Sequence, residues 1–241
     1  MLIVEKYGGT SLGDQGLMER VAAHVADLAR RGEQMVIVVS AQGHTTDVLA
    51  EKAQKIRGSS LRETDALLAT GEMQSASLMA LTLIAQGIEA VSLNGIQAGI
   101  HTDGSYGQGK ILHIDPDRIR RELDRGKVVV VAGFQGGDSQ GNIVTLGRGG
   151  SDTTAVALAA WLKADSCRIF TDVEGIYDRD PNKDPRANKY ETISYGDMLM
   201  LIDAGAQVLH RPCVELAREQ KIPIWVGSAF ADAPGTIVGL W

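Results

Sequence analysis

The stretch TLGRGGSDTTAVALAAWLKA, residues 145–164, sets glycines and a single arginine directly before an apolar helix. The β-rich run CRIFTDV follows at residues 167–173. This order predicts a glycine turn, a helix that begins at Ser151, and then a buried strand. Glycine lets backbone N–H groups approach a ligand, and a helix N-terminus favours negative charge. The segment therefore predicts an α/β fold with a site for a small anion.

The same alternation of apolar runs and helical segments extends along the whole chain. Continuous apolar runs without strict alternation are typical of parallel strands that are covered on both faces. We therefore expect one domain over residues 1–241, with a mostly parallel sheet between helix layers and a long surface loop at 178–192. Strands are expected at residues 2–7, 35–41, 90–94, 128–134, 167–173 and 222–228, and helices between Asp14 and Gly32, from Thr70 or Gly71 to about Gln86, from Asp115-Pro116, and from Ser151.

Composition narrows the function classes. The chain is 44% apolar and 22% charged with a net charge of −6, and it has no basic run, so we expect no nucleic-acid partner. No window approaches about 18 apolar residues and no signal peptide is present, which predicts a cytoplasmic protein without a membrane span. Cys167 and Cys213 lack zinc or redox spacing and are expected to be reduced core residues. The five histidines lack metal-ligand spacing, and we expect no protein metal site, with His44 and His210 structural or solvent-facing.

Glycine-bearing turns follow four of the apolar runs. In a parallel sheet such turns meet at the carboxyl edge, where ligands bind. Any one of them is explained equally well as a tight turn, but four at the same edge favour a binding site. The turns are KYGGTS (6–11), VSAQGHTTD (39–47), AGFQGGDSQG (132–141) and LGRGGSD (146–152).

Two segments imitate known nucleotide motifs. GSYGQGKI (104–111) nearly matches a phosphate-binding loop, but Ile111 cannot ligate magnesium and no clear strand precedes it, so we interpret it as a loop with a surface lysine. The glycines of the opening stretch, with Asp172 about 20 residues on, resemble a dinucleotide fingerprint. Asp152 stands where the third glycine should be, and its charge would repel a pyrophosphate.

Charged residues in this glycine context are candidate ligand contacts. Arg148 is well placed to bind a carboxylate through two parallel hydrogen bonds. Lys6 ends the first expected strand and directs a point charge at the sheet edge. Glu72 either complements a helix dipole or binds an ammonium group, and Asp172 either closes a strand or faces nucleotide or metal.

Taken together, these segments resemble the catalytic domains of aspartate kinases in the amino acid kinase family. The resemblance runs from KYGGTSLGD (6–14) to GSAFADAPGT (227–236). It includes the four glycine turns and LLATGEMQS (67–75), SLNGIQAGIHTD (92–103), FTDVEGIYDRDP (170–181) and GAQVLH (205–210).

The resemblance implies a three-layer αβα sandwich with a mainly parallel eight-stranded sheet, and transfer of a phosphoryl group from ATP, with Mg²⁺, to the side chain of L-aspartate. This reaction opens lysine, threonine and methionine biosynthesis. It also implies a homodimer. The implied catalytic residues are Lys6 and Asp152, the amino acid contacts are Ser40, Thr46, Glu72, Phe134, Arg148 and Ser151, and the nucleotide contacts are Lys6, Gly8, Gly9, Thr10, Thr171, Asp172, Tyr177, Asp180 and Gln207.

The residue types agree with that chemistry, because a carboxylate nucleophile is already ionised at neutral pH and needs no histidine base. Two alternatives remain: a kinase of the same fold acting on another amino or acyl acid, and a nucleotide-binding partner without turnover. Aspartate kinases typically continue into regulatory ACT domains, which we do not expect here. The length fits a specialised pathway, a separately encoded regulatory chain or an excised domain.

Two departures from the family pattern remove a positive charge near the expected nucleotide. Gln207 and Asn182 stand where lysine and arginine are common in the family, and Lys183, Lys189 and Arg211 are candidate substitutes for the missing cations. One exposed phosphate contact is worth only about 1 kcal/mol, and a desolvated contact is worth more. We therefore predict that Gln207→Lys lowers the Michaelis constant for ATP. Equal ATP affinities of the two proteins, measured by titration, would remove this idea.

Overall fold

The computed structural model describes residues 1–58, 60–179, 181, 184, 186–231 and 233–239. Its centre is an eight-stranded sheet in the order β10-β12-β11-β9-β1-β2-β6-β3. Every neighbouring pair in it is parallel except β11 and β12. The strands are β1 (Leu2–Tyr7), β2 (Gln34–Val39), β3 (Ala90–Leu93), β6 (Val128–Ala132), β9 (Ser166–Thr171), β10 (Thr192–Ser194), β11 (Ile224–Ser228) and β12 (Thr236–Gly239).

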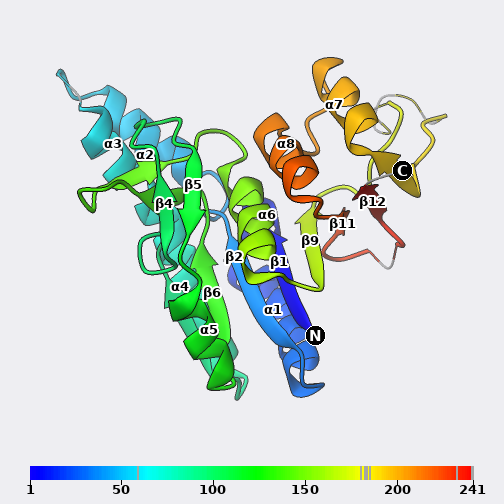
Figure 1. Cartoon of the computed structure of the whole chain (residues 1–241), viewed down its shortest axis with the longest axis horizontal. Helices are drawn as coiled ribbons and strands as arrows, with labels where there is room; N and C mark the ends of the chain where they lie inside the picture. Colours follow the sequence, from blue (N-terminus) through cyan, green and yellow to red (C-terminus); the bar gives the residue numbers. More distant parts are fainter. Residues whose placement is uncertain (59, 180, 182–183, 185, 232, 240–241) are drawn as a thin grey trace.

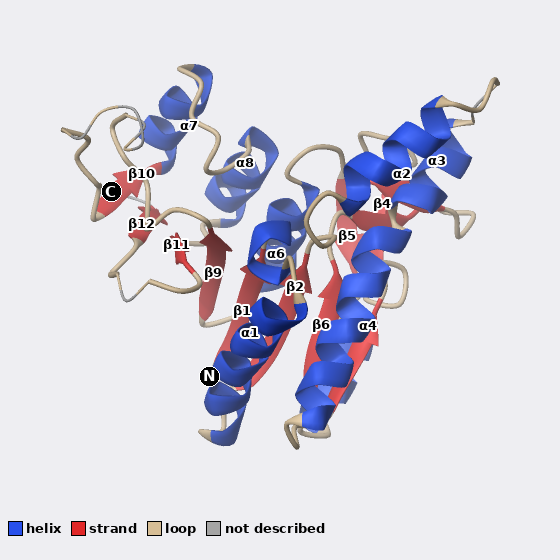
Figure 2. Ribbon diagram, turned by 180° about the vertical axis from the view of Figure 1, so that it is seen from behind, coloured by secondary structure: helices blue, strands red, loops and turns tan. Residues whose placement is uncertain are grey.

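Helices cover both faces of this sheet, so the expected three-layer sandwich and its eight-stranded sheet are confirmed. On one face α1 and α4 pack against Ile3, Ile37 and Val130 (Figure 2). On the other face α5 and α6 lie over the sheet, with α7 and α8 beside them (Figure 1). The helices of the two layers are α1 (Gln15–Arg30) and α4 (Thr70–Ala85), and α5 (Asp117–Asp124), α6 (Gly150–Leu162), α7 (Tyr195–Asp203) and α8 (Arg211–Gln220).

A second sheet and two helices lie beyond the carboxyl end of the main sheet. The sequence did not predict this unit. Its four strands have the order β5-β4-β7-β8. It comprises β4 (Ile100–Thr102), β5 (Ile111–Ile114), β7 (Gln135–Gly137) and β8 (Ile143–Thr145), with α2 (Thr45–Gln54), α3 (Leu61–Leu68) and the short 3₁₀ helix η1 (Gly9–Leu12) nearby.

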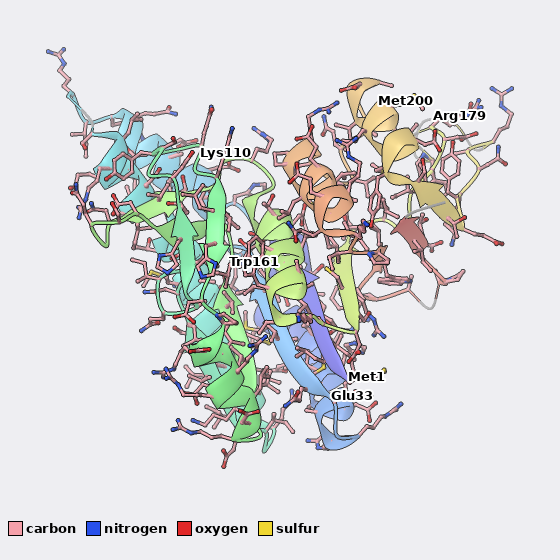
Figure 3. All side chains as sticks on the ribbon, viewed as in Figure 1. Met1, Glu33, Lys110, Trp161, Arg179 and Met200 are labelled. Carbon is pink, nitrogen blue, oxygen red and sulfur yellow. The ribbon has the colours of Figure 1, made fainter. Side chains whose placement is uncertain are left out.

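The predicted capping residues lie at the two ends of α1. The Asp14 side chain accepts a hydrogen bond from the Leu17 N–H at 2.8 Å, and caps α1. A cap of this kind stabilises a helix by about 1 kcal/mol. Gly32 follows the end of α1 with φ 88°, the left-handed conformation expected after a helix. Lys110 lies in the loop between β4 and β5 (Figure 3), so the near-match to a phosphate loop is a surface turn, as expected.

The buried residues explain one long apolar helix and confirm the expectation for the cysteines. The helical run Leu61–Ala85 is long and apolar enough to cross a membrane by length and composition alone, although no such segment was expected. Half of its most apolar window is buried, and Met79 and Leu83 pack on the sheet, so the run is explained as a core helix. Both cysteines are buried free thiols, as expected, and burial raises the pKa of Cys167 to about 12.

A buried carboxylate lies on the α1 face of the sheet. Glu5 is fully buried and accepts hydrogen bonds from the Tyr7 hydroxyl at 2.8 Å and Arg168 Nη1 at 3.3 Å. His24 Nε2 of α1 lies 3.4 Å from Glu5 Oε1. The hydrogen bond to Glu5 raises the pKa of His24, and partial burial opposes that shift. The cluster joins α1 to β1 and β9.

This contact predicts a pH-dependent part of the stability. A histidine whose pKa is raised on folding stabilises the fold below its unfolded pKa of about 6.5, and this contribution is lost as pH rises through the folded pKa. We expect His24→Asn to destabilise the protein at about pH 6 more than at about pH 8 in urea unfolding. His44→Asn is the control, because His44 and its neighbour Asp47 are both exposed. Equal losses at both pH values for His24→Asn would contradict the prediction.

Candidate active site

A cavity of about 580 Å³ opens at the carboxyl edge of the main sheet. It lies between the ends of β1, β2 and β6, the N-terminus of α6, and the second sheet with α3. All of the predicted catalytic residues and amino acid contacts line it, together with Gly9 and Thr10 of the predicted nucleotide contacts. They are Lys6, Gly9, Thr10, Ser40, Thr46, Glu72, Phe134, Arg148, Ser151 and Asp152.

An ion pair joins strand β1 to helix α6 at the floor of this cavity. Lys6 Nζ at the end of β1 lies 2.7 Å from Asp152 Oδ1 in the first turn of α6. The side chains are only 12% and 7% exposed, so the pair is largely removed from water. Its attraction is therefore stronger than that of a surface pair, and it fixes the direction of the lysine. Asp152, which stands where a dinucleotide fingerprint has its third glycine, thus holds the Lys6 ammonium in the site.

The glycines around Arg148 are required both because neighbouring side chains leave no room for a Cβ and because the backbone there adopts a positive φ. Gly149 caps α6 with φ 74°, and a Cβ at this position would lie 2.4 Å from the His210 Cβ. A Cβ on Gly150 would come within 2.9 Å of Phe134 and Leu146 side-chain atoms. The loop therefore passes between neighbours with no room for side chains. Among the described residues, no hydrogen bond or ion pair involves the Arg148 guanidinium, which is available for a ligand.

Phe134 has a conformation that a bulky residue rarely adopts. Its φ is 70°, and such left-handed backbone costs a non-glycine residue about 1–3 kcal/mol. The neighbours hold it there, because its N–H donates to Thr154 Oγ1 at 3.1 Å and its carbonyl accepts from the Leu146 N–H at 2.9 Å. Strain of this kind concentrates at ligand sites. The strained backbone of Phe134 is therefore an indication of a ligand site that does not depend on the charged side chains.

Glu72 presents an unpaired carboxylate oxygen. The residue is 3% exposed, and its Oε1 accepts a hydrogen bond from the Ala41 N–H at 3.1 Å. Its Oε2 is buried and has no partner among the described residues. Burial raises the pKa of Glu72 to about 7. A buried acceptor of this kind calls for a donor, and a positively charged donor would also restore the ionised form of Glu72.

The other predicted nucleotide residues that the structure describes do not line this cavity. Thr171 ends β9 and donates to Asp172 Oδ1 at 2.9 Å, and Tyr177 bridges to Lys189 in the following loop. Gln207 is exposed before α8. Gly8 lies close to the cavity, because a Cβ on it would lie 3.6 Å from Lys6 Nζ and 3.9 Å from the Phe170 carbonyl oxygen. Asp180, Asn182 and Lys183 lie outside the described residues.

One proposed substitute for the missing cations is already engaged. Arg211 Nη1 lies 2.9 Å from Glu215 Oε1, and its Nη2 contacts Asp203. An approaching phosphate must therefore compete with two carboxylates for this guanidinium.

Sequence reasoning missed several residues of the cavity wall, among them His210 and Asp65. His210, expected to be structural or solvent-facing, packs against Gly149 and lines the cavity. Its place in the quoted stretch GAQVLH was the available signal. Asp65 of α3 also lines the cavity and is buried. Nothing near it in the sequence indicates a contact with β8.

A second cavity, of about 690 Å³, lies against β9 and β11 near α1. Its walls include His24, Arg168, Phe170 and Trp225. It holds none of the predicted catalytic or amino acid contacts. Although it is the larger cavity, the concentration of charged groups and backbone strain assigns the chemistry to the cavity at the sheet edge.

The charges in the sheet-edge cavity define the kind of ligand it can hold. Arg148 suits a carboxylate, Glu72 suits an ammonium group, and Lys6 with the α6 N-terminus suits a further anionic group. No cluster of three or more potential metal ligands occurs in the described part of the chain. The arrangement is that of an α/β protein with a cavity whose charges suit a small zwitterion next to an anion.

Comparison with known proteins agrees with this class. The sequence profile of the amino acid kinase family matches residues 1–228, and the chain belongs to this family. The aspartokinase of Geobacillus stearothermophilus is 49% identical over 238 residues, covering 98% of this chain and 58% of that protein. The aspartokinase of Thermus thermophilus is 47% identical, covering 98% of this chain and 59% of that protein. The chain thus spans less than two thirds of the length of these relatives.

Solved structures give the same result. An aspartate kinase from Synechocystis superposes with a TM-score of 0.88 at 45% identity, covering 100% of this chain and 40% of that chain. Aspartokinase III of E. coli, in complex with aspartate and ADP, superposes with a TM-score of 0.89 at 26% identity, covering 100% and 65%.

The raised pKa of Glu72 predicts that the free energy of unfolding depends on pH. Because its pKa rises from 4.5 unfolded to about 7 folded, the protonated form stabilises the fold at low pH and this contribution is lost as pH rises through about 7. Glu72→Gln removes the penalty, and should stabilise the protein at about pH 8 by at most ~3 kcal/mol and by little below about pH 4.5. Denaturant titrations check this, with Glu63→Gln on exposed α3 surface as control. A variant that keeps the parent's pH dependence refutes the assignment.

Proposed function

We propose that the chain is the catalytic unit of an ATP-dependent aspartate kinase. It would transfer the γ-phosphoryl group of ATP to the side-chain carboxylate of L-aspartate, giving 4-phospho-L-aspartate and ADP. This is the first step towards lysine, threonine and methionine. The observation that carries the proposal is the shared cavity, in which the Lys6–Asp152 pair, Arg148 and the unpaired Glu72 oxygen lie together.

The amino acid fits the cavity by charge. Arg148 binds one carboxylate of L-aspartate and Glu72 binds its ammonium group, which restores the ionised form of Glu72. Ser40, Thr46, Phe134 and Ser151 complete the contacts. The second carboxylate is thereby directed towards Lys6, since Arg148 and Glu72 hold the other two charged groups.

The reaction needs alignment and charge neutralisation more than acid–base catalysis. The carboxylate oxygen forms a bond to the γ-phosphorus as the bond from phosphorus to the β,γ-bridging oxygen breaks, and ADP departs with the electron pair. The carboxylate has a reference pKa of about 4, so no proton must be removed. Lys6 and the backbone N–H groups of Gly9 and Thr10 stabilise the charge on the phosphoryl oxygens. Asp152 keeps Lys6 aimed at that point.

The nucleotide lies along the carboxyl end of β9 in this proposal. Its contacts are Gly8, Thr171, Asp172, Tyr177, Asp180 and Gln207. Magnesium commonly binds through one or two carboxylates and substrate phosphates and keeps several waters. The isolated carboxylates here suit an ion that arrives with ATP, and such an ion neutralises phosphate charge when bound.

The proposal also includes a cellular location, an oligomeric state and a partner chain. A cytoplasmic location follows from its substrates. A homodimer is supported by Leu81 and Ile84 on α4, which are 62% and 53% exposed near the edge strand β3. A separately encoded regulatory chain is a candidate partner.

Two other functions lead to different results. A kinase for another amino or acyl acid forms an acyl phosphate with that acid, which hydroxylamine traps as a hydroxamate. A nucleotide-binding protein without turnover binds ATP but releases no ADP with any acid. The intact Lys6–Asp152 pair favours an enzyme, because a simple binder has no need for a cation buried beside the substrate cavity.

ADP release that requires L-aspartate is the expected result. Lys6→Ala removes the cation at the reacting phosphoryl group and should lower kcat by roughly a thousandfold. Arg148→Met should chiefly raise the Michaelis constant for L-aspartate, because it removes a substrate contact. Lys110→Ala, which changes an exposed lysine outside the cavity, is the control. The proposal fails if ADP release is independent of L-aspartate or survives in Lys6→Ala.

A further inference from the structure

Asp65 makes an unusually complete set of hydrogen bonds for a side chain at a cavity wall. It belongs to α3 and is 1% exposed. Its Oδ2 accepts from the Thr145 N–H at 2.7 Å and the Gly107 N–H at 2.9 Å, and its Oδ1 accepts from the Thr145 hydroxyl at 2.8 Å. One carboxylate thus joins α3, the end of β8 and the loop before β5.

These bonds connect segments that lie far apart in the sequence. Thr145 is 80 residues from Asp65, and Gly107 is 42 residues away. Thr145 also accepts the Gly109 N–H on its carbonyl at 2.8 Å, so the 105–109 loop is tied to Thr145 directly and, through Gly107, to Asp65. Replacing the carboxylate by a small apolar side chain would leave two buried N–H donors without a partner.

The chain that leaves Thr145 leads directly to Arg148. Between them lie Leu146 and Gly147, and Gly147 has φ 73°. A glycine of this kind adds little stiffness, so the position of Arg148 depends on the anchors at either end of the loop. Gly149 and α6 form one anchor. The other is the end of β8, where Asp65 holds Thr145 and the Phe134 carbonyl accepts the Leu146 N–H.

Resting on the proposed function, we infer that Asp65 is a positioning residue for the substrate carboxylate, acting through Thr145 on the Arg148 loop. Its oxygens are occupied by the three donors, so it does not bind the ammonium group of the substrate, a role that belongs to Glu72. Misplacement of a binding group by about 1 Å is enough to weaken a reaction severely. The same contacts fix α3, whose Leu61, Thr64 and Leu68 form part of the cavity wall.

Three variants separate positioning from direct contact and from general stability. Asp65→Ala removes all three bonds. Asp65→Asn keeps an oxygen for both N–H groups and turns its amide towards the Thr145 hydroxyl, which accepts a hydrogen bond. Glu63→Ala removes an exposed carboxylate two residues away on the same helix and serves as control.

The Michaelis constant for L-aspartate should rise about tenfold or more in Asp65→Ala, with kcat at saturating L-aspartate and the Michaelis constant for ATP within about threefold of the parent. Asp65→Asn should recover most of the loss, and Glu63→Ala should match the parent. A merely structural role lowers kcat through loss of folded enzyme and leaves the Michaelis constant unchanged. That outcome, or an equal loss in Asp65→Asn and Asp65→Ala, overturns the inference.

Amide hydrogen exchange tests the same inference without any substrate. Asp65→Ala should accelerate exchange over residues 145–150 and at Gly107, with α1 and α4 unchanged. Unchanged exchange over 145–150 overturns the inference, whereas a parent protein without aspartate-dependent ADP release overturns only the proposed function. If Asp65→Ala does not fold, Thr145→Val, which removes only the hydroxyl bond, should shift exchange and affinity in the same direction by less, and no shift counts against the inference.

Discussion

The ion pair between Lys6 and Asp152 is the contact on which the active-site geometry depends. It joins the end of a central strand to the first turn of α6 at 2.7 Å, and both partners are nearly buried. Burying two charges costs several kcal/mol of hydration each, which their attraction repays only with good geometry. An apolar pair would hold strand and helix together as well. The retained charges therefore point to a role in the site, and under the proposed function that role is to stabilise the phosphoryl group.

The other charged groups of the cavity, Arg148 and Glu72, come from elements other than β1. Arg148 lies on a loop whose glycines fit between His210 and Phe134, and Glu72 enters from α4 on the opposite side. Positive and negative groups thus reach the cavity from different elements, and each is available to one group of a zwitterionic ligand. The strained backbone of Phe134 is held by hydrogen bonds to α6 and β8, which suggests that the cavity's shape is set before a ligand arrives.

Sequence alone gives the six longest parallel strands and the capped helix α1, because apolar runs and capping residues are local signals. It also points to Lys6 and Arg148, whose glycine neighbours mark the sheet edge. It misses α3 and the second sheet, since strands of three or four residues that include Gly136 and Gly137 carry almost no periodic signal. The roles of Asp65 and His210 were missed for a different reason. Their meaning arises from contacts with Thr145 and Gly149, which the chain brings near only after it has folded.

Strand β1 serves the two faces of the sheet with consecutive residues. Glu5 and Tyr7 belong to the buried cluster beside α1, while Lys6 between them reaches α6 on the other side. Because side chains alternate with a period of two, a one-residue insertion just before Glu5 would turn the Lys6 ammonium towards the cluster beside α1 and bring the Glu5 carboxylate to the cavity. Point changes can be absorbed one contact at a time, but a change of length here inverts both faces at once. Natural length variation in relatives of this chain should accordingly be confined to the surface connections and stay out of this strand.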